Sequence, residues 1–244
     1  MKKKIKNRAA GVAFALLLFG VTGCGKLQAR DQLNKGMQAY KNGNYEQAIE
    51  HFKNAVGLDN KLRVAKLYLA TAYAQQYVPG VDTPENNSDA ERAIEGYKTV
   101  LAEDPKNLRS LKGIADLYTN MKKFDDAREY YKRAIEADPN DVENYYFAGV
   151  VDWTAVYKDI SDRKAKIGLG MAEQLTTRQI CDEIKATDGP RIEDGMKMLQ
   201  TALEKKPNYD EARNYMNLLA QRKADMECSD PQASHNDQPK KPSS

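Results

Sequence analysis

Cysteine and histidine side chains could provide metal ligands, or a nucleophile with its base, and this chain of 244 residues contains three cysteines and two histidines. His51 has no cysteine or histidine near it at the spacing of a metal site, and His235 stands among polar residues close to the C-terminus. No phosphate-binding loop, nucleophile elbow or paired-histidine zinc motif occurs. The sequence therefore predicts no catalytic residues, no metal and no cofactor.

An acidic stretch at 82–89 raises the question of calcium, because carboxylate and amide oxygens are the usual ligands of that ion. The stretch lacks the central glycine and the terminal glutamate of a calcium-binding loop. Ser88 and Glu91 instead have the spacing of a capping box, and Asp89 would favour the positive end of a helix. We therefore expect a turn here, followed by a helix that begins at Ser88.

Cys24 follows a segment with the features of an export signal. The apolar run at 9–21 is shorter than the roughly 20 residues that a membrane-spanning helix needs. The basic residues before it are Lys2, Lys3, Lys4, Lys6 and Arg8. Val21-Thr22-Gly23-Cys24 resembles the lipoprotein box of bacteria, and this resemblance implies cleavage before Cys24 and lipid on its thiol. The alternative is a plain signal peptide with an incidental cysteine.

On this interpretation 1–23 is a cleaved signal peptide and 24–30 is a lipidated tether. Gly25 follows the cysteine, and by similarity to enterobacterial sorting it favours the outer membrane, facing the periplasm. Loss of 1–23 removes five basic and no acidic residues, so the formal net charge falls by five, from +3 to −2. A slightly acidic mature chain does not favour nucleic-acid binding, which needs a basic surface.

A short pattern returns four times along the chain: a small residue, a large apolar one four positions later, a small or apolar one three further on, and usually a proline. The four instances are Ala48-Phe52-Ala55, Ala93-Tyr97-Val100-Pro105, Ala127-Tyr131-Ala134-Pro139 and Gly195-Leu199-Ala202-Pro207. From Ala93 to Ala127 the period is 34 residues, the length of a tetratricopeptide unit. The chain resembles the tetratricopeptide repeat family, and this implies an all-α solenoid of stacked helical hairpins.

The register of the pattern predicts an array at 31–226. Its four units and C-terminal capping helix are expected at about 29–62, 63–107, 108–141, 142–209 and 210–226. Two departures from the register indicate insertions between the helices of a unit, of eleven residues within 77–88 and of 34 residues within about 158–190. We expect the second insertion to form an extra helix or an extended hairpin. Residues 227–244 are polar and lack apolar periodicity, so they are expected to be disordered.

Two further cysteines lie near the end of the array. Cys181 belongs to the second insertion and shares a helical face with Ile180 and Ile184, while Cys228 follows the capping helix. In an oxidising compartment a disulfide between Cys181 and Cys228 would join the insertion to the cap. Two separate thiols, one of them a small core residue, are the alternative.

In the tetratricopeptide family the first helices of successive units line a concave groove. The resemblance therefore implies a partner-binding groove that includes Tyr40, Arg109, Lys112, Asp116, Tyr146 and Trp153. Aromatic and arginine side chains often dominate binding energy at interfaces, although Trp153 could instead pack under the second insertion. The carboxylate clamp of the family is not matched, because Leu33, Met37 and Tyr68 occupy its positions and only Arg109 keeps the charge type.

Together these features predict a membrane-anchored, non-enzymatic scaffold or adaptor in the bacterial cell envelope. Its partner would be an envelope protein or peptide captured in the groove, and lipid would hold it at the membrane. The alternatives are an accessory or regulatory subunit of a cell-wall enzyme, or a glycan-binding envelope protein. Glycan binding would favour stacked aromatic rings such as Trp153, whereas peptide binding would favour the mixed Arg, Lys and Asp series.

Overall fold

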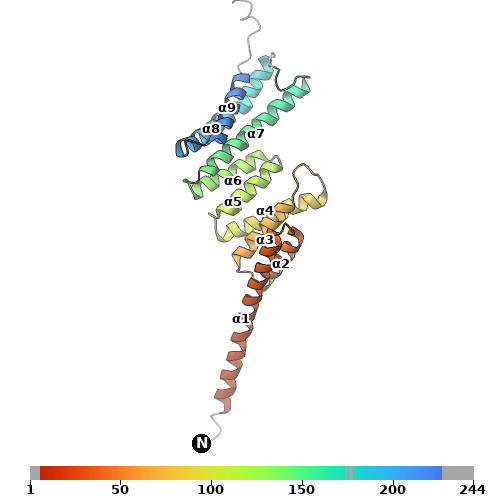
Figure 1. The fold of residues 1–244 in the computed structure, drawn as a ribbon, viewed down its shortest axis with the longest axis vertical. Helices are drawn as coiled ribbons and strands as arrows, with labels where there is room; N and C mark the ends of the chain where they lie inside the picture. Colours follow the sequence, from red (N-terminus) through yellow and green to blue (C-terminus); the bar gives the residue numbers. More distant parts are fainter. Residues whose placement is uncertain (1–5, 174, 176–177, 227–244) are drawn as a thin grey trace, which may run out of the picture. The chain divides into compact units, whose positions relative to one another are not determined.

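The computed structural model describes residues 6–173, 175 and 178–226, and within them every regular element is one of nine helices (Figure 1). The bounds are α1 Lys6–Lys41, α2 Tyr45–Leu58, α3 Arg63–Gln76, α4 Pro84–Glu103, α5 Leu108–Asn120, α6 Phe124–Ala137, α7 Val142–Lys166, α8 Arg178–Lys205 and α9 Asp210–Asp225. The expected all-α class is confirmed over the residues that the structure describes. The tail at 227–244 lies outside the described residues.

The chain divides into two compact units, Met1–Met121 and Lys122–Ser244. In the first unit each helix packs against the next, and the first helices of the repeats, α1, α3 and α5, are also neighbours. Small residues permit this close packing. A Cβ atom on Gly36 would lie 2.5 Å from the ring of Phe52, so the helices α1 and α2 approach only because that position carries no side chain.

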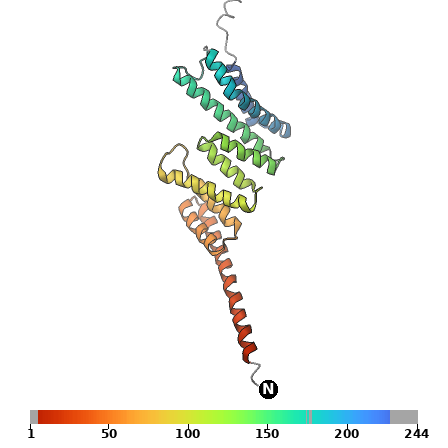
Figure 2. The ribbon, with the colours of Figure 1, turned by 180° about the vertical axis from the view of Figure 1, so that it is seen from behind.

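The first helix differs from the expected tether. Residues 24–30 are helical and continuous with the rest of α1 (Figure 2). Ala29 is fully buried, and a Cβ atom on Gly25 would lie 3.8 Å from the Leu58 carbonyl oxygen of α2. Helix α1 therefore packs against α2 already at Gly25 and Ala29, directly after Cys24. Among the described residues, no helix is both long enough and apolar enough to cross a bilayer.

The first insertion consists of a loop and an added helical turn, and the expected helix start at Ser88 is wrong. Helix α4 begins at Pro84, and Thr83 is its N-cap, accepting a hydrogen bond from the backbone N–H of Asn86 at 3.3 Å. The buried side chain of Asn86 holds the loop, because its amide donates to the carbonyls of Val78 and Val81 and its oxygen accepts from the N–H of Val78. Thr83 before a proline is the stronger signal for a helix start.

In the second unit the hairpin of α7 and α8 is longer than the others, and α9 packs against both of its helices. The second insertion therefore extends a hairpin rather than adding a separate helix. Helix α7 ends at Lys166; Gly168, two residues later, has φ +77°, and the N–H of Leu169 donates to the carbonyl of Lys164 at 2.9 Å. This is a Schellman ending, which requires the left-handed conformation that glycine adopts easily.

The interior of the extended hairpin is well filled. Ile160, Ile184 and Cys181 lie in one buried apolar cluster with residues of α8 and α9. Lys164 is 1% exposed, and its ammonium donates to the carbonyls of Met171 and Glu173, which fixes the loop between the helices. Cys181 is disulfide-bonded, while its predicted partner, Cys228, lies outside the described residues.

Candidate protein-binding surfaces

The first unit gathers aromatic and cationic side chains on the first helices of its repeats. Tyr40 of α1 lies 6.4 Å from Tyr68 of α3, measured between ring centres in an edge-to-face pair. The Arg109 guanidinium of α5 lies 5.6 Å from the centre of the same tyrosine ring, a cation–π distance. Tyr68 therefore links the predicted residues Tyr40 and Arg109. Lys112 and Asp116 follow Arg109 at three and seven positions along α5, which places them on the same helical face.

The Tyr40 phenol of this face remains neutral. Burial raises the pKa of Tyr40 above its ordinary value, although Arg109 opposes the shift. Behind this face, burial likewise raises the pKa of Tyr97, a core residue of α4 whose hydroxyl donates to the Thr71 hydroxyl at 3.2 Å. The face thus offers phenol groups and an exposed guanidinium, which together suit the carbonyls and carboxylates of a peptide.

The second unit carries a larger aromatic group, which we call the aromatic row: Tyr146, Trp153 and Tyr157 of α7 and Tyr215 of α9. Tyr215 lies 5.8 Å from Tyr146 and 5.2 Å from Trp153 between ring centres, both edge to face. Trp153 stacks on Tyr157 at 5.2 Å with 28° between the rings. The side chain of Tyr157 is 41% exposed, whereas the other three are half-buried. The row is a partly exposed surface built by two helices.

Acidic side chains surround the Tyr146 end of the aromatic row. Tyr209 lies 4.9 Å from Tyr146 between ring centres, and burial, Tyr146 and then Glu143, Glu211 and Asp141 raise the pKa of Tyr209 to about 12. We call these three carboxylates, Asp141, Glu143 and Glu211, the acidic rim. One cation also lies here, since the Lys206 ammonium is 4.1 Å from the centre of the Tyr209 ring. The rim makes this end of the row attractive to a cationic ligand.

A buried charged network fixes α7 beneath the aromatic row. Asp152 is completely buried, and Arg128 of α6 contacts it at 3.1 Å, while Arg191 of α8 lies 3.6 Å away. Arg128 also pairs with Asp194, and Arg191 with Asp125. Burial raises the pKa of Asp152 to about 6, with both arginines opposing. Because Asp152 precedes Trp153, this network holds the helix that presents the tryptophan.

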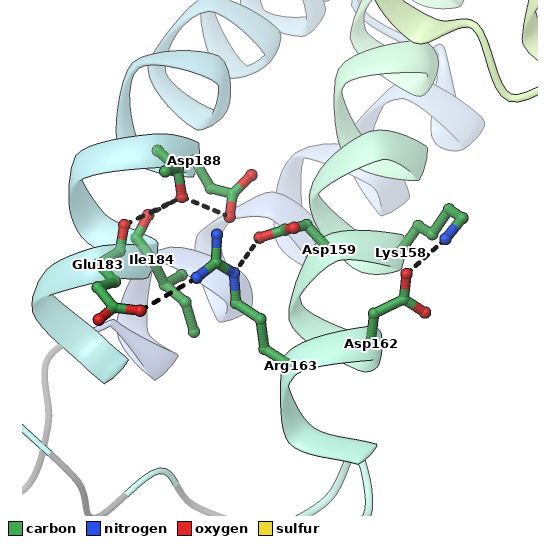
Figure 3. Close-up of polar contacts among 8 residues, drawn as sticks. Lys158, Asp159, Asp162, Arg163, Glu183, Ile184 and Asp188 are labelled. Atoms are coloured by element: carbon green, nitrogen blue, oxygen red, sulfur yellow. Dashed lines mark hydrogen bonds and ion pairs between the residues drawn. The ribbon is translucent and has the colours of Figure 1, made fainter. Parts of the chain in front are cut away.

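A second polar cluster joins the extended parts of α7 and α8 (Figure 3). Arg163 donates to Asp159 at 2.5 Å and to Glu183 at 3.4 Å. Asp188 is buried, and its carboxyl group faces that of Asp159 and accepts a hydrogen bond from the Thr187 hydroxyl at 3.4 Å. Burial and then Asp159 raise the pKa of Asp188 to about 7. The raised pKa keeps the Asp188 carboxyl partly protonated near neutral pH.

These groups do not form a reaction centre that we can name. Asp188 is 6% exposed, so its carboxyl group lies inside the hairpin rather than open to a substrate. His51 is hydrogen-bonded to Gln32 at 2.8 Å, a packing role between α2 and α1. Across the part of the chain that the structure describes, no group of three histidine, cysteine or acidic side chains is placed to hold a metal ion.

The predicted groove residues fall into two groups that belong to different compact units: Tyr40, Arg109, Lys112 and Asp116 in the first, Tyr146 and Trp153 in the second. Sequence reasoning missed Tyr68, which links Tyr40 to Arg109, and Tyr215, which links Tyr146 to Trp153. It also missed Tyr157. Positions 146, 153 and 157 are separated by seven and four residues, so helical periodicity alone could have joined Tyr157 to the row.

Comparisons with known proteins agree with this fold. The sequence pattern of the tetratricopeptide repeat matches residues 33–76 and 87–146. Over 128 residues the chain is 27% identical to "Photosystem I assembly protein Ycf3" of Prochlorococcus marinus (strain NATL2A), covering 46% of this chain and 69% of that protein. Over 112 residues it is 31% identical to "DnaJ homolog subfamily C member 7 homolog" of Schizosaccharomyces pombe, covering 44% of this chain but 21% of that protein.

Solved structures give the same architecture. The structure of MamA from Desulfovibrio magneticus RS-1 has a TM-score of 0.56 with 16% identity, covering 82% of this chain and 88% of that one. MamA AMB-1 has a TM-score of 0.53 with 17% identity, covering 82% and 85%. At these identities the similarity concerns the fold alone. Residues 33–76 and 87–146 of this chain are therefore tetratricopeptide repeats, and its helical hairpins have the architecture of these structures, one that serves as a scaffold for protein–protein interaction.

Proposed function

We propose that this chain is a non-enzymatic scaffold of the bacterial cell envelope, which captures a protein or peptide on the aromatic row. The observation that carries the proposal is the row itself, in which four aromatic rings contact one another while remaining partly exposed. Large apolar groups that stay exposed together are typical of interaction sites. Tyrosine and tryptophan lose little conformational entropy on binding and are enriched among residues that dominate interfaces.

The surface is preorganised for binding. The buried contact of Asp152 with Arg128 and the edge-to-face contacts of Tyr215 hold α7 and α9 in place before any partner arrives. A partner therefore loses little of its binding energy to ordering this side of the interface. The polar face around Arg109 in the first unit supplies a second place for contacts.

We further propose that lipid on Cys24 holds this scaffold at the outer membrane, facing the periplasm. The side chain of Cys24 is free and exposed, and the repeat array begins directly after it. Anchoring raises the local concentration of the scaffold near other envelope proteins, so modest affinity is sufficient. By extension from a relative named as an assembly protein, the partner would be a component of an envelope assembly.

Proximity crosslinking in cells, followed by identification of the crosslinked proteins, tests the binding surface. We expect one envelope protein to be captured by the wild type and lost in Tyr157→Ala, because Tyr157 is exposed and its removal leaves the fold intact. Tyr130→Ala is the matched control, since Tyr130 stacks with Arg133 in the same unit and lies outside the row. Equal capture by both variants would refute the row as the binding surface. Retention on peptidoglycan without a protein partner would instead favour the glycan-binding alternative.

Membrane fractionation tests the anchor separately. Cys24→Ser should leave the protein in the soluble fraction or as an uncleaved precursor, and it should not incorporate labelled fatty acid. Normal labelling of this variant would rule out Cys24 as the lipid attachment site.

A further inference from the structure

One end of the first unit brings exposed apolar and basic side chains together beside Cys24. We call it the Cys24 end, and it consists of residues 24–30 of α1 and residues 58–64, which connect α2 to α3. The two segments are neighbours, since a Cβ atom on Gly25 would lie 3.8 Å from the Leu58 carbonyl oxygen. Figure 1 shows α1 continuing past α2 at this end. The proposed lipid site and the α2–α3 connection therefore lie at the same end of the unit.

Large apolar side chains of the Cys24 end lie open to solvent. Leu27 is 71% exposed, Leu58 43% and Val64 40%. The packing of the unit does not cover them, because the helices bury the nearby small residues Ala29 and Ala65 instead. Large apolar side chains that are exposed together indicate a surface that another body covers.

The charge of the Cys24 end differs from that of the chain as a whole. Its four basic residues are Lys26, Arg30, Lys61 and Arg63, all exposed, and its one acidic residue is Asp59, so its net charge is +3. Without its predicted signal peptide the whole chain carries −2, five less than the +3 of the full sequence. The Asp59 carboxylate is also engaged in the turn, where it accepts from the backbone N–H of Lys61 at 3.1 Å. The covering body that complements this end is therefore both apolar and anionic.

We propose that the Cys24 end docks on an anionic phospholipid surface, with Leu27 and Leu58 at the boundary between headgroups and acyl chains and the basic side chains on the lipid phosphates. Amphipathic surfaces at membranes bury their apolar side chains about 5–10 Å deep, and anionic lipids attract the cations around them. Lysine and arginine suit this position, because their stems cover apolar surface while their charges stay at the headgroups. The inference rests on the proposed lipid on Cys24, and it adds that the protein itself contacts the membrane and is oriented by it.

The same unit contains an internal comparison at the other end of α3. This helix begins at Arg63 and ends at Gln76, so its 14 residues place the loop at 77–83 about 21 Å from the Cys24 end. The loop also exposes valines, Val78 and Val81, but it carries one acidic and no basic residue. If apolar exposure alone brought the protein to a membrane, both ends would bind. Docking that depends on the cations and on Cys24 selects the Cys24 end only.

Tryptophan fluorescence on vesicles tests the docking. Trp153, the single tryptophan of the chain, is replaced with phenylalanine, and Leu58→Trp or Leu27→Trp then supplies a reporter at the Cys24 end. Val81→Trp is the matched control, because Val81 is 44% exposed against 43% for Leu58. The full-length product, purified from cell membranes, is reconstituted in vesicles of phosphatidylcholine brominated on its acyl chains, with about 30% phosphatidylglycerol. We expect quenching of about twofold or more for both reporters and almost none for the control, because only the reporters reach the acyl boundary.

Charge variants in the Leu58→Trp background distinguish the local cations from the net charge. Each cation near an anionic surface contributes about fivefold to binding, so Lys61→Gln/Arg63→Gln should weaken docking by about 25-fold and reduce the quenching. Lys41→Gln/Arg92→Gln also removes one lysine and one arginine, both exposed, from the far end of α1 and the first half of α4. This control should leave the quenching unchanged.

The outcomes separate docking from the anchor. In a chain whose Cys24 carries lipid, equal quenching of Leu58→Trp and Val81→Trp would overturn the docking and leave the anchor intact. Equal quenching with and without phosphatidylglycerol would overturn the anionic surface as the partner. Lysine crosslinks between copies at Lys26, without quenching, would assign this end to a second copy instead.

The mass of the N-terminal peptide shows separately whether Cys24 carries lipid. A peptide without lipid would refute the proposed anchor, and the same reporters on chain added to preformed vesicles would then decide the docking, with no quenching overturning it. Capture of a protein partner on the aromatic row does not depend on either result.

Discussion

The raised pKa of the buried Asp188 predicts that stability declines as pH rises toward neutrality, and that Asp188→Asn removes this decline. The folded chain raises the pKa of Asp188 from 3.8 to about 7, so between these values it binds a proton more tightly than the unfolded chain. Stability therefore falls as pH rises from about 4 through about 7. An asparagine cannot ionise, and its amide can still donate to Asp159.

The size of the effect follows from the groups around Asp188. A shift of about three pKa units corresponds to an upper limit of about 4 kcal/mol. Arg163, which contacts Asp159 at 2.5 Å, stabilises the doubly ionised pair, and the helix ends can separate to admit water. We therefore expect Asp188→Asn to be about 1–2 kcal/mol more stable than the wild type at pH 8, and equal to it near pH 4. For a chain of this size that difference corresponds to about 2–8 °C in Tm.

Thermal unfolding monitored by circular dichroism at pH 4.5, 6 and 8 measures the difference, and hydrogen exchange of residues 178–188 places it in the extended hairpin. Asp162→Asn is the matched control, because Asp162 lies on α7 in the same hairpin but is exposed, and Lys158 lowers its pKa. The stability difference between Asp188→Asn and the wild type should grow from pH 4.5 to pH 8. The same difference at both pH values would refute the raised pKa of Asp188. An equal gain in Tm at pH 8 in Asp162→Asn would refute it as well.

Three other substitutions or measurements test the packing. Asn86→Ala removes three hydrogen bonds to the first inserted loop. We expect a loss of about 2–3 kcal/mol in unfolding free energy and faster proteolysis of that loop. An unchanged proteolysis rate would show that Asn86 does not hold the loop. Arg128→Met leaves the buried carboxylate of Asp152 poorly paired, so denaturant unfolding at pH 7.5 should show a loss of about 3–5 kcal/mol, and a loss under 1 kcal/mol would mean that Arg191 alone suffices. Mass spectrometry without reduction should find Cys181 bridged to Cys228, and free alkylation of both thiols would refute that pairing.

The fold was predictable because its determinants are local and repeated. A small residue facing an aromatic ring recurs at a fixed spacing, and the contact of Gly36 with Phe52 is the structural counterpart of that spacing. In a solenoid each unit packs on its neighbours in sequence, so a pattern that identifies one hairpin also identifies where the next one lies. Helix ends were less predictable, since the start of α4 depends on Thr83 and Pro84, while Ser88 offered an equally plausible cap.

The binding surface was only partly predictable, because its key contacts cross an interruption of the repeat. Trp153 and Tyr215 are separated by the second insertion, which breaks the register that would otherwise pair successive first helices. Asp159 and Asp188 meet for a similar reason, since only the length of the hairpin brings these distant carboxyl groups together. A periodic pattern contains no information on how far an insertion continues the helices on each side.

The insertion supports the exposed end of the aromatic row. It continues α7 to Lys166, directly beyond the turn in which Tyr157 stacks on Trp153. The added turns need support that a standard hairpin lacks. Lys164 supplies it by holding the loop, and the Arg163 cluster by joining α7 to α8. Weakening this support, as ionisation of Asp188 would, should therefore loosen Tyr157 and reduce partner capture more than it affects the Tyr40 and Arg109 face of the first unit.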